Sequence, residues 1–440
     1  MPNRRPNVLY IHSHDTGRCM EPYGFPVEMP AYRRLAETGV TFRQAFSAAP
    51  TCSPSRAALL TGVAPHSAGM LGLAHRGFVL RDPSRHLARF LRSNGYHTCL
   101  AGHQHLTSGD PRKLGYETVY ESGNGDAADV APNAVSFLRQ AQRGGGRPFF
   151  LDVGFDETHR PFHEAPVDAG RYVAVLPGLP DTVETRQDMA RFHASLRELD
   201  RGVEMVLDEL EASGQAENTI VILTTDHGPA FPGMKSTLTD AGIGVGLIVR
   251  APGMTTPGTV IDALVSQIDL YPTICDVAGL ERPAWLQGYS MVPLLDGRSK
   301  RIRDEVFGEV TFHAAYEPQR VIRTDRWTYI RRFEDQEHPV LSNIDASPAR
   351  DILLEHGWAE RIWSRTSLFD NVVDPLQRDN LTDRPEHAIV EADLSRRLEA
   401  WMRATDDPLL AGPVPLPKGA RVNRVSDGSP DDPLVDADFR

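Results

Sequence analysis

The chain has 440 residues, of which 40% are hydrophobic, 24% charged and 8% aromatic, and this composition is typical of a soluble globular protein with one large core and a smaller second domain. Its net charge of −12 argues against nucleic acid or an anionic membrane as the main partner, because either would require a basic face. The four cysteines are widely spaced and show no metal-like pairing, which fits a reducing compartment (Cys19, Cys52, Cys99 and Cys275).

The first predicted strand, residues 7–12, begins close to Met1 and leaves no room for a signal peptide ahead of it. No apolar run along the chain approaches the length needed to cross a membrane. We therefore expect a cytoplasmic protein, with an exported form whose leader precedes this sequence as the alternative. No feature of the sequence indicates an oligomeric state.

Strand and helix patterns alternate along the first part of the chain, as a doubly wound α/β domain requires. The clearest helix covers residues 186–213, where apolar side chains recur at intervals of three and four. Predicted strands cover residues 7–12, 98–101, 148–155, 218–225 and 243–249. Predicted helices cover residues 30–38, 84–93, 129–142, 186–213 and 269–278. This order predicts a large mixed sheet with helices on both faces.

Beyond about residue 316 the pattern changes. Residues 320–324 and 327–333 are predicted to form antiparallel strands, and residues 389–403 a helix. Residues 406–440 are rich in Pro, Asp and Gly and are expected to wrap the surface or to be partly mobile. The sequence therefore predicts two domains, an α/β domain over residues 1–315 and a smaller α+β domain, an antiparallel sheet plus a helix, over residues 316–440.

The stretch PTCSPSRAALLTG, residues 50–62, predicts a helix with Cys52 at its N-terminal end and Gly62 at its C-terminal end. The N-terminal end of a helix carries free N–H donors and the positive pole of the helix dipole, so it favours anions. With Arg56 nearby, a thiol at position 52 is expected to be acidified. The alternative interpretation is a small residue that precedes an ordinary buried helix.

Two predicted strands end in acidic residues. VLYIHSHD ends at Asp15 and IVILTTD ends at Asp226. Ligands of open α/β sheets gather beyond the carboxyl ends of the strands, so we expect these two ends to meet. Asp15 and Asp226 would then supply oxygen ligands to a divalent cation. Either Asp alone can instead cap the helix that follows it.

The string CSPSR, followed after two residues by LLTG, resembles the signature of the type I sulfatases. In that family a maturation enzyme converts the cysteine to formylglycine, so the resemblance implies this modification at Cys52. Residues 48–62 all fit, the companion motifs follow in family order over most of the chain, and the similarity is greatest to the heparan N-sulfatases (sulfamidases) and their bacterial relatives. The resemblance implies an alkaline-phosphatase-like fold. Cys-dependent phosphatases need a longer spacing than that between Cys52 and Arg56.

The resemblance also implies a metal site held by Asp15, Asp226 and the formylglycine oxygen at position 52. Two neighbouring residues depart from the family pattern, because His14 stands where most sulfatases have a second Asp, and His227 stands where many have Asn. Both histidines are candidate ligands by position. We expect one divalent cation, Ca²⁺ as the family default, or Mn²⁺ or Zn²⁺ if both imidazoles coordinate, because these two metals accept nitrogen ligands.

Three further segments resemble family motifs around the reacting sulfate. AGHQH matches Gly-Lys-x-His with His103 in place of Lys, which implies that His103 contacts a sulfate oxygen and that His105 bonds the formylglycine hydroxyl and helps to eject sulfate. His159 and Arg160 lie in a segment similar to the Asp-Pro-His-Arg of sulfamidases, where the His faces the leaving group. Lys235 fits the second cation on the leaving-group side.

Glu309, His313 and Arg320 resemble residues of the sulfamidase segment that lines the sugar side of the pocket. With His103 and Arg160 they form the predicted substrate-binding set. A structural role is the alternative for each of them, because resemblance alone does not establish contact with substrate.

Together these residues predict hydrolysis of a sulfate ester or a sulfamate, on a sugar, through a formylglycine hydrate at position 52. The metal and Arg56 would neutralise charge on the transferring group, and His159 with Lys235 would protonate the departing atom. Two alternatives stay open, a phosphonate or phosphodiester hydrolase on the same scaffold and a non-catalytic protein that binds anionic sugars. The expected partners are a sulfated small molecule or sugar and the formylglycine-generating maturation enzyme.

Overall fold

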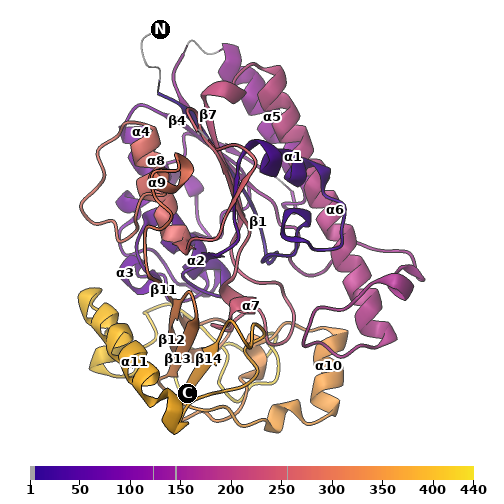
Figure 1. The fold of residues 1–440 in the computed structure, drawn as a ribbon. Helices are drawn as coiled ribbons and strands as arrows, with labels where there is room; N and C mark the ends of the chain where they lie inside the picture. Colours follow the sequence, from indigo (N-terminus) through magenta and orange to yellow (C-terminus); the bar gives the residue numbers. More distant parts are fainter. Residues whose placement is uncertain (1–4, 122, 144–145, 255) are drawn as a thin grey trace.

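The computed structural model describes residues 5–121, 123–143, 146–254 and 256–440, and within these ranges eight strands form one mixed sheet (Figure 1). The strand order is β5-β4-β6-β1-β7-β8-β2-β9, and β8 runs antiparallel to both of its neighbours, whereas the other pairs are parallel. The strands are β1 Asn7–Ser13, β2 Val40–Phe42, β4 His97–Gly102, β5 Thr118–Tyr120, β6 Phe149–Gly154, β7 Thr219–Thr225, β8 Leu247–Arg250 and β9 Thr259–Ile261. The predicted α/β class is confirmed.

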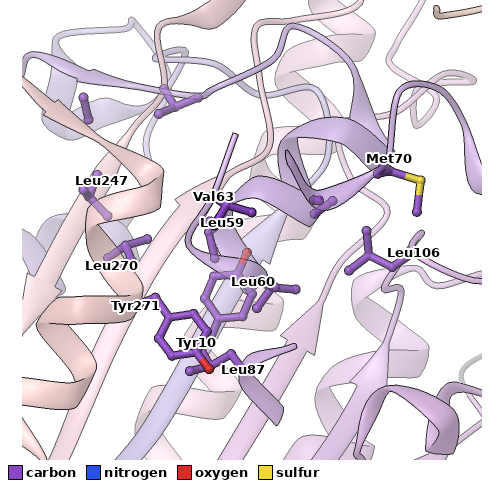
Figure 2. Packing of buried hydrophobic residues seen from close by; sticks show 14 of the residues in the cluster. Tyr10, Leu59, Leu60, Val63, Met70, Leu87, Leu106, Leu247, Leu270 and Tyr271 are labelled. Carbon is purple, nitrogen blue, oxygen red and sulfur yellow. The ribbon is translucent and has the colours of Figure 1, made fainter. Parts of the chain in front are cut away.

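Helices cover both faces of this sheet (Figure 1). One face packs against α2 Cys52–Thr61, α4 Leu87–Ser93 and α8 Leu270–Val277, and the other against α1 Pro30–Thr38, α5 Ala127–Arg143 and α6 Val183–Ala212. Successive residues of a strand point to opposite faces, so in β1 Tyr10 packs with the first set and Ile11 with the second. Figure 2 shows Tyr10 beside Leu60 and Tyr271. Among the helices of the described ranges, none is both long and apolar enough to cross a membrane.

Two elements begin later than the sequence predicts. The helix predicted over residues 84–93 begins at Leu87, because His86 has an extended backbone and its Nδ1 accepts a hydrogen bond from the Ala88 N–H at the helix start. The strand predicted over residues 243–249 begins at Leu247, because residues 240–243 form the short helix α7 Asp240–Ile243.

A second, antiparallel sheet lies in the C-terminal part of the described chain, in the order β11-β12-β13-β14. Its strands are β11 Glu305–Phe312, β12 Tyr316–Thr324, β13 Trp327–Arg332 and β14 Thr366–Asp370. The boundary expected at residue 316 therefore falls between the first two strands of this sheet. Val306 and Val310 of β11 pack with Phe46 and Ile243, and this apolar cluster joins the second sheet to the larger part of the molecule.

Further strands and helices complete the two parts. They include β3 Ala45–Phe46, β10 Val265–Ser266, α3 Pro65–Ala68, α9 Val292–Leu295, α10 Pro348–Glu355 and α11 Ala388–Ala404, the last of which packs on β12 and β13. The tail after α11 lies against the body of the protein, since Phe439 packs on Phe312 and the Arg421 N–H donates to the Arg76 carbonyl. Of the two expectations for residues 406–440, the structure shows the one in which they wrap the surface.

Candidate active site

The N-terminal end of α2 lies beside the carboxyl ends of β1 and β7. Because these strands are parallel neighbours, with Ser13 paired to Thr225, the turns that follow them meet. The Asp15 N–H donates to Asp226 Oδ1 over 2.9 Å, and the buried guanidinium of Arg56 donates to Asp226 Oδ2 over 3.0 Å. The structure therefore places the two strand ends and α2 together, as expected from their sequence positions.

The five predicted metal ligands lie at this meeting point. His14, Asp15, Cys52 and Asp226 are buried, and their ligating atoms lie within 4.8 Å of one another. His227 Nε2 is 3.3 Å from Asp15 Oδ1 and 3.3 Å from Cys52 Sγ. The arrangement gives two carboxylates, two imidazoles and the side chain at position 52 around one small volume.

The hydrogen bonding of this cluster fits a bound cation. His14 Nε2 and Asp15 Oδ1 are buried and have no hydrogen-bond partner among the described residues, although His14 Nε2 lies 3.2 Å from Asp226 Oδ2. Burial lowers the pKa of His14 well below its ordinary value, so the ring is neutral, and when its Nδ1 donates to Asp156 the lone pair of Nε2 faces the carboxylates. A lone pair and two carboxylates that face one another are stabilised by a cation between them, and this donor set suits a divalent metal.

The second oxygen of Asp15 is held by a buried lysine. Lys235 Nζ lies 2.8 Å from Asp15 Oδ2 and 3.2 Å from Asp345 Oδ2, and His159 Nε2 lies 3.9 Å from the same Asp15 oxygen. Burial raises the pKa of Asp345, but the charges of Lys235 and His313 outweigh it and hold that pKa below its usual range. Lys235 therefore bridges the carboxylates of Asp15 and Asp345, and His159 lies on the Asp15 side of this bridge.

A group of histidines lies on the side of the site formed by the loop after β4. The rings of His14 and His159 stack with centroids 4.6 Å apart, and those of His103 and His105 lie 4.9 Å apart. Burial lowers the pKa of His103 to about 3 and that of His105 well below its ordinary value, so both rings are neutral at pH 7. A cavity of about 400 Å³ borders both rings. Each ring can therefore donate or accept one proton next to open space.

The thiol of Cys52 does not have the low pKa expected from its place at a helix N-terminus. The side chain is 2% exposed. Burial raises the pKa of the thiol well above its ordinary value, and the nearby charge of Lys235 does not compensate, because Asp15 and Asp226 raise it further. The expectation of an acidified thiol is therefore wrong, and the unmodified side chain stays protonated.

Glu309 and Arg320 have a different setting from the substrate contacts that the sequence predicts. Their exposed fractions are 1% and 0%. Glu309 accepts from the His66 N–H over 2.8 Å and contacts His66 Nδ1, while Arg320 donates to both oxygens of Asp407 over 2.6 and 2.9 Å. These pairs join α3 to β11, β12 and the segment after α11. Both residues therefore take part in buried pairs, and contact with substrate stays a prediction for each of them.

Arg160 lies next to the site, and its charge is paired with a carboxylate. Its guanidinium donates to both carboxylate oxygens of Asp188 in α6 over 3.0 and 2.6 Å, and to the Ala230 carbonyl over 3.0 Å. It therefore ties the His159 segment to α6 and to the turn that carries Lys235. Among the predicted substrate-binding residues, His103 and His313 are the ones that lie with the cluster.

Three neighbours of the site were not found from the sequence: His75, Asp156 and Asp345. His75 Nδ1 lies 3.0 Å from His105 Nε2, Asp156 contacts His14, and Asp345 contacts Lys235. His75 lies in a short 3-10 helix and Asp345 in a connecting segment, both outside the motifs, whereas Asp156 lies in the segment of His159 but was not given a role there. Only the fold brings these side chains to the site.

Two family models match the chain. The model described as Sulfatase matches residues 6–280, and the model described as N-sulphoglucosamine sulphohydrolase, C-terminal, matches residues 234–352. Among curated proteins, a Ulvan-active sulfatase of Formosa agariphila is 26% identical over 97% of this chain and 87% of its own length. Human N-sulphoglucosamine sulphohydrolase is 28% identical over 92% of each chain.

The solved structures agree with the fold. A protein described in complex with its substrate D-glucosamine-2-N,6-O-disulfate superposes with a TM-score of 0.73 at 19% identity, over 93% of this chain and 99% of that chain. A 2-O glycosaminoglycan sulfatase superposes with a TM-score of 0.70 at 21% identity, over 93% of this chain and 94% of that chain. The predicted alkaline-phosphatase-like fold is confirmed.

Proposed function

Because the chain belongs to the sulfatase family, a family of hydrolases, we propose that it hydrolyses a sulfate ester or a sulfamate on a sugar by way of formylglycine formed from Cys52. The observation that carries this proposal is the position of Cys52 at the start of α2, with Sγ 3.3 Å from His227 and within 4.8 Å of the ligating atoms of Asp15 and Asp226. In the formylglycine form, a hydroxyl oxygen of the hydrate would take the place of Sγ. As its hydrate, formylglycine would supply the nucleophile for the sulfur atom.

The cluster around position 52 would hold one divalent cation. We assign Asp15, Asp226, His227 and the side chain at position 52 as its ligands, with His14 as a further candidate. Bound there, the metal would supply positive charge beside the transferring group. The oxygen ligands favour Ca²⁺, whereas coordination by both imidazoles would favour Mn²⁺ or Zn²⁺.

Arg56 holds the carboxylate of Asp226 in place. Its guanidinium donates to Asp226 Oδ2 and to the Ser13 carbonyl, so it holds the turn after β1 against the turn after β7. A buried, permanently charged group in this position also lowers the energy of negative charge that develops nearby. Its role therefore combines positioning with electrostatic stabilisation.

Lys235 and His159 would assist the departure of the leaving group. Both approach Asp15 Oδ2, at 2.8 and 3.9 Å, so they converge on one side of the carboxylate pair. The imidazole of His159 is one-third exposed and can reach a bound substrate, whereas the ammonium of Lys235 is buried. We assign the proton transfer to the departing oxygen or nitrogen to His159, with Lys235 as the fixed positive charge beside it.

His103 and His105 would act on the sulfate side. The Ser53 hydroxyl donates to the His105 carbonyl over 2.6 Å, which fixes this loop against the first turn of α2, where Cys52 lies. We assign to His105 the removal of a proton from the side chain at position 52 as sulfate leaves, and to His103 a hydrogen bond to a sulfate oxygen. In most of the family a lysine takes the place of His103, so this chain replaces a fixed charge by a neutral ring.

The relatives support a sulfated sugar as the substrate. Human N-sulphoglucosamine sulphohydrolase is named for a sulfated sugar, and the C-terminal model of that name covers residues 234–352, which include Lys235, His313 and Asp345. The net charge of −12 disfavours a long polyanion over a short substrate. A sulfated monosaccharide or short oligosaccharide is therefore the class we propose.

Activity measured on a matched panel tests the proposed function. Protein co-expressed with a formylglycine-generating enzyme should hydrolyse at least one O-sulfated or N-sulfated sugar, and Cys52→Ala should fold but lose activity. A clear preference for phosphodiesters over every sulfated sugar would replace the proposal by the phosphodiesterase alternative. Binding of sulfated sugars without turnover of any of them would favour the non-catalytic alternative.

A further inference from the structure

A second cavity, of about 620 Å³, lies between the turn after β7 and the C-terminal sheet. Its walls come from residues 232–241 on one side and from β13, β14 and the segments after α10 and β14 on the other. We call it the arginine groove. It shares no lining residue with the cluster around Cys52.

The charge of the arginine groove is opposite to that of the whole chain. Arg332, Arg361 and Arg378 line it, and no Asp or Glu is among its lining residues in the described ranges, whereas the chain carries a net charge of −12. Arg332 is paired with Glu317. Arg361 and Arg378 are exposed, and neither forms a side-chain hydrogen bond or ion pair with another described residue. The groove therefore offers two unneutralised guanidinium groups, which suit a carboxylate or a sulfate.

Aromatic surface lies beside these charges. Trp358 and Trp363 both line the groove and are half-buried, and the guanidinium of Arg332 lies 4.4 Å from the ring centre of Trp363. Ile362, between them in sequence, is 74% exposed. Flat apolar surface next to guanidinium groups is the lining expected for a ligand that has both an apolar face and negative charge.

One turn of the chain, residues 233–237, separates the arginine groove from the active site. Gly233, Met234 and Thr237 line the groove, while Lys235, in the same turn, reaches inward to Asp15. A smaller cavity of about 30 Å³ is lined by Lys235 together with Trp358 and Trp363. A ligand in the groove would thus lie directly behind the lysine assigned to the leaving-group side.

We propose that the arginine groove binds an anionic sugar residue of a short oligosaccharide, with the carboxylate or sulfate of that residue on Arg361 and Arg378 and its ring against the tryptophans. This inference rests on the proposed function for the class of ligand, since a pyranose with an acidic group combines an apolar face with a charge. The groove makes the enzyme prefer substrates longer than one sugar.

Binding to the unmodified full-length protein tests the groove without any need for turnover. In calorimetric titration with a heparin-derived tetrasaccharide, the double variant Arg361→Gln/Arg378→Gln should bind about tenfold more weakly than the original protein, the loss expected for charge-assisted hydrogen bonds at a partly exposed site. Arg143→Gln is the matched control, because Arg143 is exposed on α5 and has no ion pair among the described residues. It should bind like the original protein.

Two results would overturn the inference: equal dissociation constants for the original protein and the double variant, or no binding of the tetrasaccharide to the original protein. The latter is also the result expected if the groove holds an acidic peptide. Hydrolysis of a sulfated monosaccharide by the formylglycine form is measured separately. Loss of that hydrolysis with the groove effect retained would refute the proposed function alone, and the reverse pattern would refute the groove alone.

Discussion

Lys235 donates a 2.8 Å hydrogen bond to Asp15, and this contact joins the leaving-group side of the site to the carboxylate pair assigned to the metal. Because Asp15 shares its two oxygens between Lys235 and His227, the positions of the cation, the lysine and the side chain at position 52 depend on one another. A substitution of Asp15 is therefore expected to impair both metal binding and protonation of the leaving group.

Removing the lysine should reduce catalysis far more than binding. Lys235→Ala deletes the buried positive charge beside the departing atom, and we expect kcat on a small sulfated sugar to fall by about 100-fold with a smaller change in KM. Steady-state kinetics will measure this. Lys300→Ala is the control, since Lys300 is exposed. A variant at position 235 with unchanged kcat would remove Lys235 from the mechanism.

Removal of the metal should affect both stability and activity. Without a cation, the carboxylates of Asp15 and Asp226 and the lone pair of His14 repel one another in a buried site, so a chelator should lower Tm as well as abolish most turnover. Elemental analysis should find one divalent ion per active chain. Asp226→Asn should reproduce the loss, whereas Asp335→Asn, at a side chain that is 89% exposed, should not. Full activity in protein shown to be free of divalent metal would contradict this assignment.

The pair Arg320 and Asp407 should matter for stability and leave substrate binding unchanged. Arg320→Met leaves the buried carboxylate of Asp407 without its partner, and we expect the free energy of unfolding to fall by about 3 kcal/mol. Urea unfolding measures this loss. Well below the Tm of the variant, KM for a small sulfated sugar should equal that of the original protein. A raised KM with normal stability would restore Arg320 as a substrate contact.

His86 should make stability depend on pH. Burial lowers its pKa from 6.5 to about 4, so between these values the unfolded chain binds the proton more tightly, and the free energy of unfolding falls as the pH is lowered. The contribution amounts to about 1 kcal/mol between pH 7.5 and 5.5. His86→Asn keeps an acceptor for the Ala88 N–H and removes the titration. Urea unfolding at both pH values should therefore show a smaller loss in the variant than in the original protein, and equal losses would rule out this role.

The fold could be predicted from the sequence where local pattern and tertiary packing agree. The long helix α6 was predicted within a few residues because its apolar spacing matches its buried face, and β1 and β7 because both are apolar on two faces. The strand β11, which begins at Glu305, was missed although it forms a hairpin with β12, because Gly308 and Glu309 interrupt its apolar pattern. The cytoplasmic location stays a prediction.

Only those residues of the candidate site that lie in sequence motifs could be predicted. Asp15, Cys52 and Asp226 follow from strand ends and a helix start, which the topology of parallel strands brings together. Asp345 could not be found, since it comes from a connecting segment that only the packed structure carries to Lys235. The acidified thiol was wrongly expected for Cys52, because the helix end favours the thiolate but burial beside two carboxylates opposes it more strongly.

The central claim, that Cys52 becomes the nucleophile as formylglycine, is tested most directly by peptide mass spectrometry of the segment around residue 52 in protein co-expressed with a formylglycine-generating enzyme. Preparations with different degrees of conversion are assayed in parallel on the best sulfated sugar. We predict a peptide in which an aldehyde replaces the thiol, and a turnover rate that rises in proportion to its fraction. Full activity in protein that contains only the free Cys52 thiol would contradict the account.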